Sequence, residues 1–153
     1  MQLTATIDAT DVVEKLQKFA FVLPFKADRA AEITADEAYQ RITRSAYWKN
    51  QSGKLARSFG GAPKRIADGY YRVSSSSKVA VFMNGGTRAH RIEARKKSTL
   101  RFVQNGTVRF ARSVMHPGTK ATNFQAVEQQ IGQVVLERRA AKAVEESAKL
   151  AGL

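Results

Sequence analysis

The chain has few residues of the types that carry out chemistry. It contains no cysteine and only two histidines, His90 and His116, neither of which has a third ligand nearby at helical or strand spacing. In the middle of the chain, residues 44–120, the only carboxylates are Asp68 and Glu93. No local pair of acids is therefore available for general acid–base catalysis or for Mg²⁺. We expect no metal site, no cofactor and no enzymatic activity.

The serine- and glycine-rich stretches do not change this expectation. Ser52–Leu55 and Ser74–Ser77 lack the Gly-x-Ser-x-Gly elbow of serine hydrolases. The pairs Gly60–Gly61 and Gly85–Gly86 lack the Gly-x4-Gly-Lys-Ser/Thr spacing of a phosphate-binding loop. Both histidines lie in predicted turns that contain glycine, and we expect them to be hydrogen-bonding loop residues.

The chemical property that the chain does offer is positive charge, and this charge is unevenly distributed. Among 153 residues, 26 are Lys or Arg and 13 are Asp or Glu, for a formal net charge of +13. Residues 44–120 carry +15, whereas residues 1–43 carry −2 and residues 121–153 are neutral. Such a field attracts a polyanion, which can be nucleic acid, an anionic membrane surface or an acidic protein. A solvated basic surface without a partner is the alternative.

The densest part of this charge is the segment Arg88–Arg101, which has six Lys or Arg and one Glu in 14 residues. Such a segment can neutralise several phosphates, and its affinity would depend on salt. Aromatic residues do not alternate with these cations, so a stacking surface for single strands is not indicated. No helix-turn-helix, zinc-finger or ribonucleoprotein motif is present to read bases. The candidate residues for contact with DNA or with an acidic neighbouring protein are Arg88, His90, Arg91, Arg95, Lys96, Lys97 and Arg101.

The elements that must position this segment follow from the spacing of apolar residues. Alternation over Leu3–Ile7 predicts a short strand. Asp8 and Thr10 are candidate caps of a first helix, which we expect Pro24 to end. Between about residues 25 and 48, alanine recurs every three or four residues and predicts a second helix. This helix must depend on its neighbours for stability, because alanine buries little apolar area.

The rest of the chain is predicted to form strands and then one long helix. Between residues 69 and 114 the pattern is typical of short strands, and Val79–Met83 is an apolar run of strand length. Asn105 and Gly106, between two β-prone runs, predict an antiparallel hairpin, since a type I′ turn needs positive φ at both positions. Apolar residues at helical spacing over 123–149 predict a C-terminal helix whose last turns project beyond the domain toward a partner.

Together these elements predict a single α+β domain over residues 1–153. It comprises an N-terminal strand and helices (1–49), a basic region of antiparallel sheet or meander with loops (50–120), and the C-terminal helix (121–153). No apolar run approaches the roughly 20 residues of a membrane span, and the N-terminus has no signal-peptide pattern, so we expect a soluble cytoplasmic protein. The residues expected to form its structural turns are Gly53, Gly85, Gly86, Asn105, Gly106, Pro117 and Gly118.

Three stretches of the chain, taken in order, resemble one protein family. Ser52–Phe59 is similar to a (T/S)-G-x-L-x-x-S-(I/F) segment that follows the N-terminal helix in that family. Val81–Ile92 is similar to its y-v-E-x-G-T-x-x-H-x-I strand and turn, with Asn84 in place of Glu. Leu100–Phe102, the Asn-Gly hairpin and His116–Phe124 complete the pattern. Over about half of its length the chain thus resembles the tail-completion proteins of tailed bacteriophages, which are also described as head–tail joining, neck or tail-component proteins.

The resemblance implies a non-enzymatic virion protein that forms one ring layer at the head–tail junction, through which the genome passes. Its partners would be copies of itself in the ring, the head-side connector or closure protein, and the tail terminator or tail-tube protein, with DNA in the lumen contacted without sequence specificity and no membrane. It would be assembled in the host cytoplasm and reside in the neck of the virion. The alternatives within this class are a tail terminator and a head-closure protein. The charge also leaves open a free basic protein that binds nucleic acid without sequence specificity.

Overall fold

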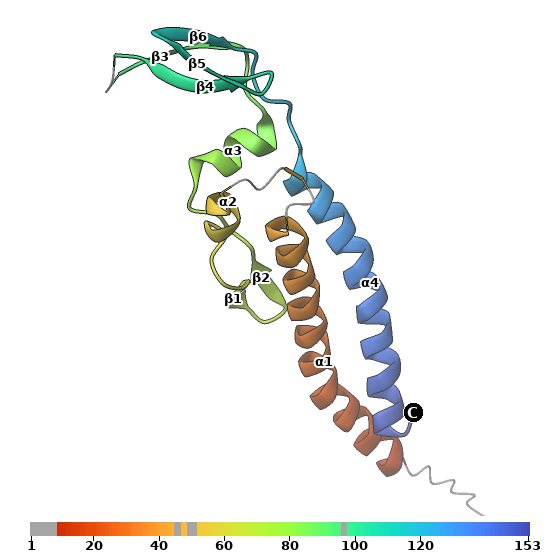
Figure 1. The fold of residues 1–153 in the computed structure, drawn as a ribbon. Helices are drawn as coiled ribbons and strands as arrows, with labels where there is room; N and C mark the ends of the chain where they lie inside the picture. The colour runs from red at the N-terminus through yellow and green to blue at the C-terminus, as the bar shows by residue number, and fades with distance from the viewer. Residues whose placement is uncertain (1–8, 45–46, 49–51, 96–97) are drawn as a thin grey trace, which may run out of the picture. The chain divides into compact units, whose positions relative to one another are not determined.

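The protein has an α+β fold, as the sequence predicts. The computed structural model describes residues 9–44, 47–48, 52–95 and 98–153. Within these residues it has two long helices, two short helices and three antiparallel strand pairs (Figure 1). The predicted strand Leu3–Ile7 and the predicted cap Asp8 lie outside the described residues. Within the described part, no helix combines the length and the apolar character needed to cross a membrane.

The chain divides into two compact units. The helical unit consists of Met1–Ser76 and Gln125–Leu153, and the arm unit consists of Ser77–Phe124. The single domain predicted for the whole chain stays a prediction. The division also separates the charge, because the arm unit contains 10 Lys or Arg and one acidic residue, whereas the helical unit contains 16 and 12. The arm unit therefore carries +9 and the helical unit +4.

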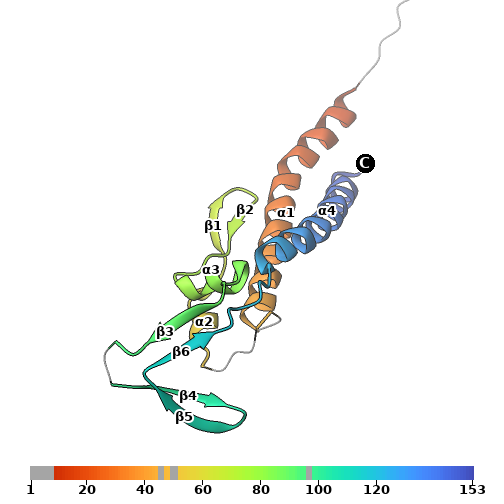
Figure 2. The ribbon, with the colours of Figure 1, turned by 90° about the horizontal axis from the view of Figure 1, so that it is seen from above.

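The helical unit is built on two long antiparallel helices that lie side by side (Figures 1 and 2). Helix α1 spans Thr10–Thr43 and α4 spans Phe124–Ala151. Their contact is made of small side chains, as the alanine spacing predicts, and these let the two backbones approach closely. The buried small residues on the two helices are Ala30, Ala31, Thr34, Ala143, Ser147 and Ala151.

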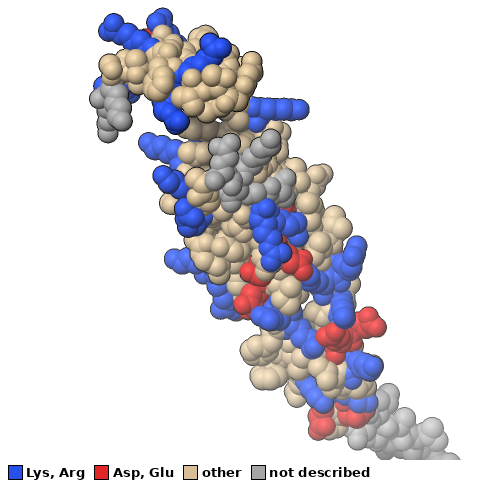
Figure 3. All heavy atoms as spheres, viewed as in Figure 1, with Lys and Arg blue, Asp and Glu red and all other residues tan. Residues whose placement is uncertain are grey.

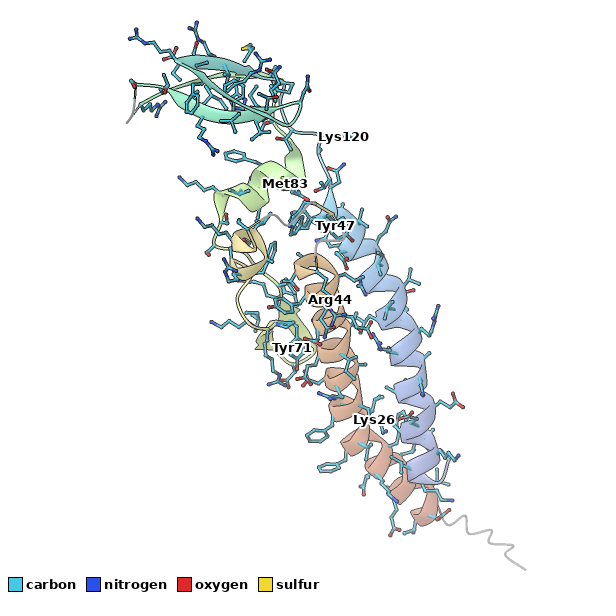
Figure 4. All side chains as sticks on the ribbon, in the orientation of Figure 1. Lys26, Arg44, Tyr47, Tyr71, Met83 and Lys120 are labelled. Atoms are coloured by element: carbon cyan, nitrogen blue, oxygen red, sulfur yellow. The ribbon has the colours of Figure 1, made fainter. Side chains whose placement is uncertain are left out.

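Ion pairs connect α1 and α4 along their length. The pairs are Lys26 with Glu146 at 2.6 Å, Arg139 with Glu37 at 2.6 Å, and Arg41 with Glu128 at 2.8 Å. Figure 4 shows Lys26 on the side of α1 that faces α4. The last turns of α4 therefore pack on the first half of α1, and Ser147 is fully buried there. The prediction that these turns project toward a partner is wrong, because their small residues are used within the unit.

Helix α1 does not end at Pro24, and the predicted break is wrong. Pro24 lies inside the helix. A proline fixes φ near the helical value and removes one backbone donor, so a helix that packs along a neighbour on both sides of the proline can continue past it. The residue before the first turn is Ala9, which provides no side-chain cap, so the predicted cap Thr10 is wrong as well. The helix ends at Thr43 rather than near Trp48.

A short hairpin packs on the second half of α1. Strand β1 (Lys64–Ala67) pairs with β2 (Tyr70–Arg72), and sequence reasoning predicted only the second of them. Asp28 of α1 accepts a hydrogen bond from the Gly69 backbone N–H at 2.7 Å and another from the Tyr71 hydroxyl at 3.1 Å (Figure 4). One carboxylate thereby attaches the turn of the hairpin to the long helix.

Helix α2 (Lys54–Arg57) is a single turn that begins after Gly53, the glycine predicted to form a turn there. Gly53 has φ of +69°, a left-handed conformation that residues with a Cβ rarely adopt. Just beyond the helix, Phe59 is buried and stacks on Trp48, with ring centroids 6.1 Å apart. This aromatic pair forms the apolar centre of the helical unit near the end of α1.

The arm unit begins with helix α3, which spans Lys78–Gly85. The strand predicted for Val79–Met83 is wrong. A short apolar run does not by itself distinguish a strand from a helix, and the signal that decides is the preceding residue. The Ser77 hydroxyl accepts a hydrogen bond from the Val79 backbone N–H at 3.2 Å and so caps the first turn of the helix.

Four strands follow in the arm unit. They are β3 (His90–Glu93), β4 (Leu100–Gln104), β5 (Thr107–Ala111) and β6 (Ser113–His116). Strand β4 pairs with β5 across Asn105 and Gly106, whose φ angles of 51° and 76° confirm the predicted turn. Strand β3 pairs with β6, which the sequence reasoning did not predict.

The two strand pairs of the arm unit are parts of one ribbon. Thr87 and Thr119 form a β-bridge at its base, and the β3–β6 ladder continues with the same register. The ladder extends to Ala94, whose N–H donates to the Arg112 carbonyl at 3.0 Å, and it resumes directly afterwards in β4–β5. On one strand residues 95–99 separate the two ladders, whereas on the other strand Arg112 and Ala111 are adjacent. Figure 2 shows that the β3–β6 and β4–β5 ladders run in different directions. We call the ribbon Thr87–Thr119 the arm.

Candidate functional site

The base of the arm depends on two glycines. The Thr87 and Thr119 backbones donate hydrogen bonds to each other at 2.9 and 3.1 Å. Gly86 has φ of +72°, and a Cβ there would lie 2.7 Å from the Thr119 carbonyl oxygen. Gly118 has φ of +95°, and its Cβ would collide with the Thr87 carbonyl oxygen. Gly85, by contrast, has open space around it. Of these three predicted turn residues, Gly86 and Gly118 therefore allow the strands to meet.

The remaining predicted turn residues have different surroundings. Asn105 and Gly106 form the tip of the arm, and Pro117 is exposed between β6 and the bridge at Thr119. Gly53 belongs to the helical unit and is not part of the same site.

The arm carries exposed cations with little compensating charge. In the described part of the arm unit, the only ion pair is formed by Arg91, whose Nε lies 3.3 Å from a Glu93 carboxylate oxygen. Arg91 Nη2 also donates to the Ser113 hydroxyl at 3.0 Å. Figure 3 shows Lys and Arg gathered over the strands of this unit. The other described cations, all exposed, are Lys78, Arg88, Arg95, Arg101, Arg109, Arg112 and Lys120.

The structure brings the predicted site residues onto this one ribbon. Arg88 precedes β3, and His90 and Arg91 lie in it. Arg95 follows β3, and Arg101 is the second residue of β4. Lys96 and Lys97 lie outside the described residues. The described part of the densest basic segment therefore lies along one side of the two ladders.

The two histidines are direct partners across strands β3 and β6, so the prediction that they are loop residues in separate turns is wrong. His90 lies opposite His116, with ring centroids 5.1 Å apart. His90 Nδ1 lies 2.9 Å from the Arg88 carbonyl oxygen and is a donor in the neutral ring. His116 Nδ1 accepts from the Gly118 N–H at 3.1 Å, so Nε2 carries the proton in the neutral ring. Because Nε2 of His116 carries a proton and Nδ1 already accepts a hydrogen bond, neither nitrogen offers a lone pair to a metal ion in this arrangement.

The tip of the arm combines cations with exposed apolar side chains. Directly paired residues lie on the same face of a ladder, and alternate residues lie on opposite faces. One face of β4–β5 therefore carries Arg101 beside Phe110 and Val103 beside Val108. The side chains of Phe110 and Val103 are each 64% exposed. The opposite face pairs half-buried Phe102 with Arg109.

Sequence reasoning missed Arg109, Arg112 and Phe110 as site residues. The signal that could have found them was the predicted turn at Asn105 and Gly106. Counting outward from that turn gives the cross-strand pairs of the hairpin, and these pairs place aromatic residues directly beside arginines. The cations and aromatic residues do not alternate along the chain. They are instead direct partners on neighbouring strands, as Arg101 is of Phe110 and Arg109 is of Phe102.

The arm unit has very little core. Among its described residues, only Ala80 and Phe124 are buried. A two-stranded ribbon is at best marginally stable by itself in water, because it can bury one face at most. The exposed apolar and basic side chains of the arm are therefore available for contact with another molecule.

The helical unit has a second exposed apolar surface, on the first half of α1. Its members are Phe21 and Phe25, which lie one turn apart on the side of α1 opposite to the buried residues Ala30 and Thr34. Phe21 and Phe25 are 71% and 67% exposed, and their rings contact each other at a centroid distance of 5.6 Å. Because the α4-facing side of this segment is also apolar, the helix is apolar on more than one side, which is typical of a helix that is covered on both.

Among the residues the structure describes, no group of three or more His, Asp or Glu side chains is placed to hold a metal ion. In comparisons with known proteins, no family model, no curated protein and no solved structure matches the chain.

Proposed function

We propose that this chain is a structural, non-enzymatic virion protein of a tailed bacteriophage, a subunit of a ring layer at the head–tail junction. The particular assembly is inferred from the ordered motifs Ser52–Phe59, Val81–Ile92 and His116–Phe124. The proposed partners are further copies of the chain, the head-side connector or closure protein, and the tail terminator or tail-tube protein. The proposed location is the neck of the virion.

The observation that best supports an assembly role is the exposed apolar surface on the first half of α1. Burying a Phe side chain contributes about 1.5–3 kcal/mol, and a pair of exposed Phe side chains in contact with each other marks a candidate protein contact. The local charge is balanced, since Asp11 and Glu14 are matched by Lys15 and Lys18. A second copy can therefore approach this helix without the repulsion that two arm units, at +9 each, would experience.

The experiment is to replace Phe21 and Phe25 together by serine in the phage that encodes the chain. Both side chains are exposed, so the subunit is expected to fold, and its circular dichroism should match the wild type. Ring formation should fail, and electron micrographs should show separate heads and tails in place of complete virions. In wild-type virions, a map of the neck should contain a ring of this subunit.

Ile66→Ser is the matched control, because Ile66 is also an exposed apolar residue of the helical unit but lies on β1. It should leave virion assembly unchanged. Normal virions with the double variant, or a neck without the subunit, would show that the proposal is wrong.

A free basic protein that binds nucleic acid remains the second candidate function, and the exposed cations of the arm favour it. The genes beside this one discriminate between the two functions. Portal, capsid and tail-tube genes favour the virion subunit, whereas translation genes favour the free protein.

A further inference from the structure

We propose that the arm is a duplex-DNA-binding element that inserts its two-stranded ribbon into a groove. This inference goes beyond the place of the chain in a virion, because it concerns the purified protein and can be tested without a phage. The positive charge of the arm would suit an acidic protein equally well. The features described below favour duplex DNA as the partner.

Positive charge is dense and exposed on the arm. The arm contains eight Lys or Arg and a single acidic residue, Glu93. Of the cations that the structure describes in the arm, only Arg91 has a carboxylate within ion-pair distance. Duplex DNA presents one negative charge per roughly 1.7 Å of its axis, and cations that replace its counterions gain affinity from their release.

These cations lie on both faces of the ribbon. At the tip, Arg101 lies on the face with Phe110, and Arg109 lies on the opposite face with Phe102. A ribbon that docks on a flat protein surface needs its cations on one face. In a groove, the two phosphate backbones run along the edges of the ribbon, and long arginine side chains from either face can reach them.

The shape of the arm also suits a groove. The major groove of B-DNA is about 12 Å wide and admits a two-stranded β-ribbon. The two ladders of the arm, β3–β6 and β4–β5, run in different directions, as Figure 2 shows. A bent ribbon can follow a curved groove over a longer distance than a straight one.

The apolar side chains at the tip fit the same location. Phe110, Val103 and Val108 can contact thymine methyl groups on the groove floor without reading sequence closely. Single-stranded DNA is the weaker candidate, since stacking needs several exposed aromatic rings. In the described part of the arm, Phe110 is exposed but Phe102 is half-buried.

The test measures binding of the full-length protein to a fluorescent duplex of about 30 base pairs of random sequence, between 50 and 200 mM salt. The wild type should bind with an affinity that falls steeply with salt. Arg101→Gln with Arg109→Gln removes two contacts, so the slope of log affinity against log salt should fall by about 2. At 0.1 M salt this change corresponds to roughly 50-fold weaker binding.

The matched control removes the same charge from the helical unit. Arg138 and Lys149 are exposed on α4, and Arg138→Gln with Lys149→Gln should leave the slope and affinity close to those of the wild type. Equal losses in the two double variants would mean that only net charge matters, and would overturn the proposal.

A third variant tests groove insertion itself. Phe110→Ala should weaken binding roughly fivefold without changing the salt slope, because it removes an apolar contact and no charge. The protein should also displace the major-groove ligand methyl green from the duplex. An unchanged affinity for Phe110→Ala, or no salt-dependent DNA binding at all, would overturn the proposal and assign the arm to an acidic protein surface. Neither result bears on the virion experiment with Phe21 and Phe25.

Discussion

Glu128 shows how a single charged side chain is accommodated between the long helices. It is 6% exposed and accepts hydrogen bonds from Arg41 Nε and Nη2 at 2.8–3.1 Å and from the Tyr47 hydroxyl. A buried carboxylate is tolerated only when it is paired and hydrogen-bonded in this way. Burial and the hydrogen bond to Glu128 together raise the pKa of Tyr47 to about 12.

The raised pKa of Tyr47 predicts a loss of stability in alkali. A group whose pKa is higher in the folded state stabilises the fold fully below its unfolded pKa, here 10, and this contribution is lost as pH rises toward 12. Urea unfolding at pH 8 and pH 11 should show a smaller loss of unfolding free energy for Tyr47→Phe than for the wild type. Tyr70→Phe, at an exposed position on β2, is the control and should retain the wild-type loss. An equal loss in Tyr47→Phe would contradict this account.

At the scale of residues, the sequence predicts which side chains are charged but not which of them meet. Arg88, Arg91 and Arg101 were predicted as a basic cluster from their spacing alone, and they are exposed on one ribbon. The pairing of His90 with His116 depends on a strand register set by contacts 26 residues apart in the chain. No local pattern reports such a contact.

The elements show where local signals fail and why. The Asn-Gly turn was predicted correctly because its conformation depends on only two residues, Asn105 and Gly106. Pro24 and the run Val79–Met83 were misread because the outcome depends on neighbours, on α4 in the first case and on the Ser77 cap in the second. Local propensity is a weak prior wherever packing or capping can override it.

The base of the arm predicts contrasting effects for two adjacent glycines. Gly86→Ala places a Cβ against the Thr119 backbone at a positive φ, and should lower the unfolding free energy by about 2 kcal/mol or more. Gly85→Ala has open space at the end of α3 and should be neutral, or stabilising by up to about 1 kcal/mol. Urea unfolding followed by circular dichroism measures both changes. Similar effects for the two variants would mean that the strands do not meet as described.

The whole molecule joins two units with different physical character. The α+β class and the long C-terminal helix could be predicted, because periodicity is clear over such lengths. The boundary at Ser77 could not, because the charge does not change sharply there, whereas the excess of positive charge does end at Lys120, close to the boundary at Phe124. The partition of charge became meaningful only with this division, which concentrates +9 of the net charge in the arm unit.

The helical unit contains paired carboxylates whose pKa values are lowered, and we therefore expect acid to destabilise this unit. The hydrogen bond from the Gly69 N–H lowers the pKa of Asp28, the hydrogen bonds from Arg139 lower that of Glu37, and the bond from Lys26 lowers that of Glu146. A carboxyl whose pKa is depressed in the folded state stabilises the fold above its unfolded pKa, and this contribution is lost as pH falls through the folded value. The thermal midpoint should therefore decrease as pH falls below about 4.5, the unfolded value for Glu.

Glu37→Gln tests this origin of the acid sensitivity. The variant should have a lower thermal midpoint than the wild type at pH 7, and a smaller decrease between pH 7 and pH 3. The single glutamate of the arm unit, Glu93→Gln, serves as the control and should change neither quantity. A wild-type acid response in Glu37→Gln would contradict the assignment.

The pairing of α1 with α4 also has a consequence for synthesis of the chain on the ribosome. Lys26 and Glu146 are 120 residues apart, and the whole arm unit lies between the helices that they join. When α1 emerges, the partner for its alanine-rich face has not yet been made, and it is completed only when the 28 residues of α4 have emerged. The nascent chain must therefore carry an uncovered helix while the whole arm unit is synthesised, and the helical unit cannot form before α4 has emerged.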